Sequence, residues 1–268
     1  MERIFFNQKI YPLSSKALQK PNTLEGAGLP KSTSIILLTI SLVGLCIFQL
    51  NSLAAYLNSP GNLINDTISS LVYAPNGWLQ TAAFYILSLS IMALAVLLQL
   101  KAPVKLNLGA IILALIGFGL ILLGTFPTQF PGHPFMAGIH KWTAFIVFTL
   151  LPVAGFFVAA TFKKWNYRFL YKYSIAANIL QLVFVFTGGA LLLMHIELLG
   201  LFERVSLWNA QIWLTGICLY FLLAETKHDF PVISKNRPVT KPAVYCFLYM
   251  YGSMLMPVSL SLLKTAFR

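Results

Sequence analysis

Seven long apolar stretches, separated by short polar segments, dominate the pattern of hydrophobic and polar positions along the chain. The hydrocarbon core of a bilayer is about 30 Å thick, and an α-helix needs roughly 20 consecutive apolar residues to cross it. The stretches that meet this requirement are 34–57, 79–100, 106–126, 139–162, 174–193, 205–224 and 243–263. The pattern predicts an all-α polytopic transmembrane helix bundle with seven spans, a six-span core followed by a C-terminal apolar segment.

The apolar stretches indicate helices rather than the strands of a membrane barrel. Strands of a closed barrel alternate between lipid-facing and interior positions with a period of two. Here the apolar runs are continuous, as in 111–114 and 182–186, which is typical of helices that satisfy their own backbone hydrogen bonds. The composition agrees, because 58% of the residues are hydrophobic and only 10% are charged. No ordinary soluble domain has this balance.

The basic residues fall almost entirely on alternate sides of the stretches. One side carries 15 of the 19, namely Arg3, Lys9, Lys16, Lys20, Lys31, Lys101, Lys105, Lys163, Lys164, Arg168, Lys172, Lys227, Lys235, Arg237 and Lys241. The other side carries Lys141, Arg204, Lys264 and Arg268. Basic loops are retained in the cytoplasm, so the N-terminus is predicted to be cytoplasmic. The same rule accounts for the net charge of +12 without a nucleic-acid partner.

This topology divides the chain into four regions. Residues 1–33 are predicted to form a basic cytoplasmic tail, 34–224 a six-span membrane domain, 225–242 a basic cytoplasmic loop and 243–268 a seventh span with a short tail. The last apolar segment contains polar and helix-breaking residues, Gly252, Ser253, Pro257, Ser259 and Ser261. An arrangement of six spans, with this segment lying in the cytoplasmic interface, is therefore the alternative.

Amide side chains interrupt the fifth and sixth stretches. They are Asn178, Gln181, Asn209 and Gln211. Amides within a membrane commonly join helices through hydrogen bonds, and this is the role predicted here. A polar substrate cavity is the alternative.

The residue types that could carry chemistry gather on the face opposite to the basic loops. They are Asp66, Ser69, His140, His195, Glu203 and Arg204. Asp66 and His140 are predicted to form an acid/base or ligand pair. Arg204 is suited to an anionic group such as a lipid phosphate, and Glu203 is the second candidate binding residue.

Several short motifs on this face resemble a known family. They are 65–69 followed by 76–78, then 126–128, 139–140 and 200–204. Over about 34–224 the chain resembles the bacterial and archaeal membrane proteins called domain of unknown function 998. The resemblance implies a six-span unit with a functional outer face and no established activity. Gln129 stands where that family often has an acid, so the resemblance supplies no catalytic carboxylate there.

A metal-dependent hydrolase acting on a lipid or lipid-linked substrate is one interpretation of the outer face. Asp66, His140 and His195 are ligand types that zinc accepts, and a bound zinc ion could hold an activated water. Ser69, three residues after Asp66, could assist. These ligands come from three loops and have no diagnostic spacing.

Three other interpretations remain open. His140 and His195 could be axial haem ligands, or the protein could be a carrier for a small solute, although no charged residue lies near the centre of a stretch. The leading interpretation is a structural or accessory membrane protein. In that case Asp66 would cap a short helix at 67–70 or pair with Arg204 or Lys141, and Glu203 and Arg204 would have separate partners.

The predicted setting follows from the same pattern. The chain is expected in a cell membrane, the bacterial inner membrane given the family that it resembles, as a multi-pass protein. The lipid bilayer and other membrane proteins are the expected partners.

Overall fold

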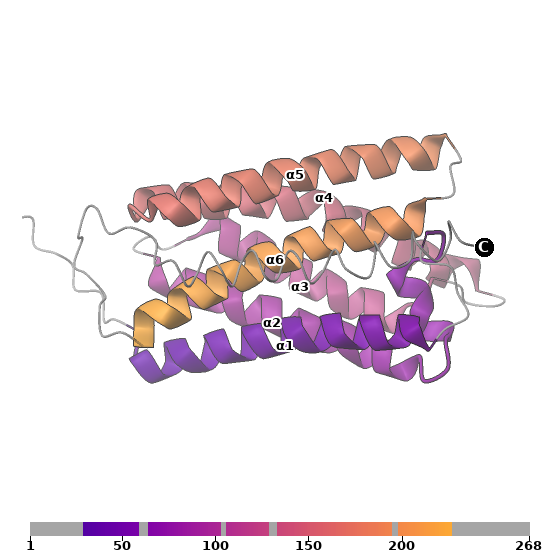
Figure 1. Ribbon diagram of the computed structural model, residues 1–268, viewed down its shortest axis with the longest axis horizontal. Helices are drawn as coiled ribbons and strands as arrows, with labels where there is room; N and C mark the ends of the chain where they lie inside the picture. Colours follow the sequence, from indigo (N-terminus) through magenta and orange to yellow (C-terminus); the bar gives the residue numbers. More distant parts are fainter. Residues whose placement is uncertain (1–28, 59–63, 103–105, 129–132, 195–197, 227–268) are drawn as a thin grey trace, which may run out of the picture.

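The computed structural model describes residues 29–58, 64–102, 106–128, 133–194 and 198–226. Within these ranges the chain forms six long α-helices and one short 3-10 helix (Figure 1). In chain order they are α1 (Lys31–Leu57), η2 (Ile68–Tyr73), α2 (Trp78–Lys101), α3 (Leu108–Thr125), α4 (Pro134–Lys164), α5 (Arg168–Leu193) and α6 (Leu199–Thr226). The protein is therefore an all-α helical bundle.

All six α-helices are long and apolar enough to cross a membrane. The prediction of a six-span core is thus confirmed as six candidate spans. The predicted seventh span at 243–263 lies outside the described residues, as does most of the predicted N-terminal tail.

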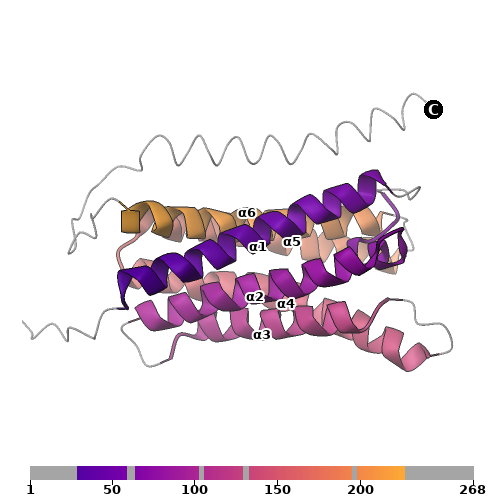
Figure 2. The same cartoon turned by 90° about the horizontal axis from the view of Figure 1, so that it is seen from below.

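The six helices form a closed ring in chain order. Each helix packs against the next one in the chain, and α6 packs against α1. The first and the last helix of the domain therefore lie side by side (Figures 1 and 2). The short helix η2 lies at one end of the ring, against α1, α2 and α6. We call this the η2 end, and we call the opposite end, where α6 finishes, the Glu225 end.

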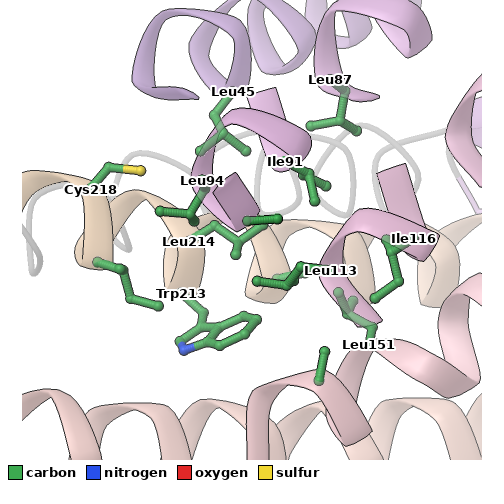
Figure 3. Packing of buried hydrophobic residues seen from close by; sticks show 14 of the residues in the cluster. Leu45, Leu87, Ile91, Leu94, Leu113, Ile116, Leu151, Trp213, Leu214 and Cys218 are labelled. Atoms are coloured by element: carbon green, nitrogen blue, oxygen red, sulfur yellow. The ribbon is translucent and has the colours of Figure 1, made fainter. Parts of the chain in front are cut away.

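Apolar side chains fill the middle of the ring. Leu94 of α2, Leu113 of α3 and Leu214 of α6 are each at most 1% exposed, and Figure 3 shows them side by side with the indole of Trp213. Large apolar residues also cover the outside, for example Phe186 on α5, which is 73% exposed. An apolar exterior is what a bilayer requires, since lipid rather than water surrounds these helices.

Amide hydrogen bonds join α5 to α6, as the sequence predicted. The Asn209 side chain donates to Gln181 Oε1 at 2.8 Å and to the Ala177 carbonyl at 2.9 Å, while the Gln181 amide donates to Ser206 Oγ. Two of the four amides depart from this pattern. The Asn178 amide donates to the Ser174 carbonyl within α5 at 2.7 Å. Gln211 is buried, and among the described residues its amide has no hydrogen-bond partner.

Candidate functional site

The segment 64–70 lies directly on the first turn of α6. The Leu201 amide donates to the Ile64 carbonyl at 3.0 Å. A Cβ atom on Gly200 would stand only 2.3 Å from the carbonyl oxygen of Asp66, so a residue with a side chain cannot occupy this position without moving backbone. The glycine therefore brings two segments more than 130 residues apart into contact.

Glu203 holds the start of η2. Its carboxylate accepts a hydrogen bond from the Ile68 amide at 3.0 Å, and the amide and hydroxyl of Ser69 also face it. The N-cap residue Thr67 accepts from the Ser70 amide through its side chain at 3.2 Å. The first amides of a helix have no partner within the helix, and here the two side chains supply acceptors. The sequence predicted a short helix at this place with Asp66 as its cap; the helix is present, and the cap is Thr67.

Arg204 holds the preceding part of the same segment. The residue is only 3% exposed. Its Nη1 donates to the Asp66 carbonyl and, at 3.0 Å, to the Gly200 carbonyl within α6. Its positive charge also interacts with the Glu203 carboxylate. A buried charge is tolerated only with such partners, so Arg204 and Glu203 act together to fix segment 64–70.

His140 serves a different part of the bundle. It is buried in α4, and its Nδ1 lies 2.5 Å from the carbonyl oxygen of Phe126 at the C-cap of α3. Helix α4 packs against α3 and α5, whereas η2 packs against α1, α2 and α6. These helix contacts give no support to the predicted pair of His140 and Asp66, which stays a prediction.

The predicted zinc ligand set stays a prediction, because His195 lies outside the described residues. Within the described part of the chain, no group of three or more His, Cys, Asp or Glu side chains could hold a metal ion. Asp66, Ser69, Glu203 and Arg204 do come together, but their described contacts are largely with backbone groups and a neighbouring hydroxyl.

Sequence reasoning missed two contributors to this cluster. Gly200 carried a usable signal, because a glycine at the start of a candidate span often marks a close backbone approach. Thr67 also carried one, since a hydroxyl before a helix is a common N-cap. We call the group of Asp66, Thr67, Ser69, Glu203 and Arg204, with Gly200 beneath it, the loop-anchoring cluster.

Comparison with known protein families gives a match over most of the bundle. The model of a family described as "Protein of unknown function (DUF998)" matches residues 41–220, which is most of the described bundle from α1 to α6. No curated protein and no solved structure matches the chain.

Proposed function

The chain belongs to the DUF998 family of proteins of unknown function, and from this premise we propose that it is a structural or accessory component of a cell membrane. The observation that carries this proposal is what the charged side chains of the loop-anchoring cluster bind. Two oppositely charged side chains, Glu203 and Arg204, are held among backbone groups of segment 64–70. Hydrogen bonds from these side chains to the backbone support a role in fixing the loop.

The fixed loop presents exposed side chains at the η2 end. Tyr73 and Trp78 are 48% and 68% exposed, and Pro75 and Asn76 between them are also exposed. Aromatic residues that keep one face in water are common at protein interfaces and at the membrane surface. We propose that this surface, defined by Tyr73, Pro75, Asn76 and Trp78, contacts another membrane protein.

The proposed orientation places the η2 end outside the cytoplasm. The excess of Lys and Arg on the other side supports it. The family resemblance supports a bacterial inner membrane as the site of action.

A photo-crosslinker at the exposed surface tests the proposal. Benzoylphenylalanine is placed at Tyr73 in the full chain, in its native membrane, and as a matched control at Phe118, which is 54% exposed on α3. We expect a discrete protein adduct from position 73 and mainly lipid adducts from position 118. If position 73 yields lipid adducts alone, the accessory role through this surface is wrong.

The hydrolase alternative receives less support from the same geometry. The Ser69 hydroxyl lies 3.1 Å from Thr67 Oγ1 and also faces Glu203, and His140 is held by Phe126. A nucleophile needs a base within hydrogen-bonding distance; Glu203 is the candidate that the structure offers. A hydrolase would lose turnover in Ser69→Ala while keeping its thermal stability, which an esterase and lipase substrate panel would reveal.

The transport alternative would require a polar route through the ring. The middle of the ring is packed with Leu94, Leu113 and Leu214 (Figure 3), so passage of a polar solute would need these helices to separate. Flux of labelled solutes into proteoliposomes tests this alternative directly.

A further inference from the structure

The corner between α4 and α5 is a tight and well-defined turn. Only residues 165–167 separate the two helices. The Tyr167 amide donates to the Phe162 carbonyl at 2.9 Å and the Asn166 amide donates to the Lys163 carbonyl at 3.1 Å. Asn166 has φ 62°. These two bonds and one left-handed residue form a Schellman motif, which ends a helix with its carbonyls satisfied.

Four cations surround this corner. Lys163 and Lys164 close α4, and Arg168 and Lys172 belong to the first turns of α5; all four are exposed. No acidic residue occurs in 163–172. Among the described residues none of the four forms an ion pair, and the described carboxylate at this end, Glu225, is bound to Lys101 at 2.7 Å. The corner therefore carries a concentrated positive charge.

Aromatic rings pack together at this corner, and one of them lies beneath a cation. Lys163 Nζ lies 5.7 Å from the centre of the Tyr171 ring, close enough for a cation–π interaction. The Trp165 ring packs against Phe162 at 6.0 Å and against Tyr167 at 6.1 Å. A charged side chain held by an aromatic ring loses less conformational freedom when it binds an anion.

The position of the corner indicates which anion it meets. Two candidate spans end there, and cations just beyond a span lie at the depth of lipid headgroups. Trp and Tyr rings are also typical of this depth. On α4, Phe157 and Val153 are 41% and 38% exposed, about two turns or more inside the corner, where acyl chains would run.

We propose that the four cations of this corner, Lys163, Lys164, Arg168 and Lys172, bind the phosphate headgroup of an anionic phospholipid, with the Tyr171 ring beneath Lys163. A soluble phosphate compound would use the charges but not the apolar face of α4. The proposal is independent of the accessory function, because it concerns the opposite end of the bundle.

Native mass spectrometry of the full chain in a non-ionic detergent tests the proposal. Phosphatidylglycerol and phosphatidylcholine are titrated separately, and we expect tighter binding of the anionic lipid. Removing two cations in Arg168→Gln/Lys172→Gln should weaken phosphatidylglycerol binding roughly 10- to 30-fold and leave phosphatidylcholine binding unchanged. The matched control is Lys31→Gln/Lys141→Gln, which removes the same charge from exposed positions elsewhere.

Three outcomes would overturn the proposal. The first is an equal loss of affinity in the control variant, which would mean that net charge alone attracts the lipid. The second is displacement of the lipid by glycerol phosphate at matched concentration, which would mean a soluble anion site. The third concerns folding: if Arg168→Gln/Lys172→Gln does not fold, then Lys163→Gln/Lys164→Gln removes the same charge from α4. Full affinity in that variant would contradict the proposal.

Discussion

The two ends of the bundle differ in whether their charged side chains are buried or exposed. At the η2 end Arg204 is buried, and it and Glu203 are bound to the backbone of segment 64–70. At the Glu225 end four cations of the α4–α5 corner remain exposed, while Lys101 and Glu225 at the ends of α2 and α6 form a largely buried ion pair. The first arrangement fixes a loop, and the second leaves charge available at the surface.

The supporting contacts differ in the same way. Aromatic rings close the Glu225 end, where Phe162 lies 6.0 Å from Phe221 and Tyr167 lies 5.8 Å from Phe221. Burial, with smaller contributions from Tyr220 and Glu225, raises the pKa of Tyr167, so its phenol stays neutral at physiological pH. Ring packing tolerates small shifts, whereas buried charges require specific partners. The η2 end should therefore be the more sensitive to single substitutions.

The largest effect is expected from Arg204→Met. The change leaves Glu203 without its positive neighbour and the Asp66 carbonyl without a donor, which should lower the free energy of unfolding by about 3–5 kcal/mol. Thermal unfolding in detergent measures it. Arg168→Met at the exposed corner is the control and should stay within about 0.5 kcal/mol. Equal melting of the two variants would show that the ends do not differ as described.

A smaller loss is expected from Gly200→Ala. The new Cβ would meet the Asp66 backbone at 2.3 Å, and the strain should cost about 1–3 kcal/mol. Gly189→Ala on α5 is the matched control, because no atom lies within 4 Å of its added Cβ. The control should be neutral or stabilising by up to about 1 kcal/mol. A stable Gly200→Ala variant would contradict the close approach of segment 64–70 to α6.

The ion pair of the Glu225 end can be measured by a double-mutant cycle. Lys101→Met and Glu225→Gln should each destabilise the protein, and the pair should show a coupling free energy of about 1–2 kcal/mol. The 2.7 Å contact and the low exposure of both side chains, 15% and 6%, are the reason. Independent, additive effects of the two substitutions would mean that the ion pair contributes nothing to stability.

The smallest changes in stability are expected at a turn residue with positive φ, which both ends of the bundle contain. Asn76 and Asn166 have positive φ values of 63° and 62°, in turns before α2 and α5. Alanine at either position should cost about 1 kcal/mol, and glycine should change stability by at most about 0.5 kcal/mol. Thermal melting of the four variants checks this. A large difference between the two turns would show that one of them is held by contacts beyond its own backbone.

The spans were predictable because their signal is local. About twenty apolar residues identify a membrane helix wherever it packs, and the predicted first six stretches correspond to α1–α6. The boundaries were less accurate. Helix α4 begins at Pro134 instead of 139, since proline fits the first turn of a helix, and α5 begins at Arg168 instead of 174. In α5 the added residues include the exposed Arg168 and Lys172, which lie outside the apolar stretch from which the span was predicted.

The partners in the candidate site were not predictable in the same way. The sequence identified Glu203 and Arg204 as important, but their partners are the Ile68 amide and the Asp66 carbonyl, 135 and 138 residues away. His140 likewise binds the Phe126 carbonyl. Backbone amides and carbonyls are nearly the same in every residue, so the sequence does not indicate which of them a distant side chain will bind.

The closed ring has a consequence for how the protein assembles in the membrane. Helices α1 to α5 each pack against a neighbour that is adjacent in the chain, so each can pair soon after its insertion. The contact of α6 with α1 is the exception, and α6 also brings Gly200, Glu203 and Arg204 to segment 64–70. That loop therefore reaches its final position only when the sixth helix has been inserted. Protection of the loop from protease during synthesis would then mark a completed bundle, and chains arrested before α6 would expose it to the quality-control machinery of the membrane.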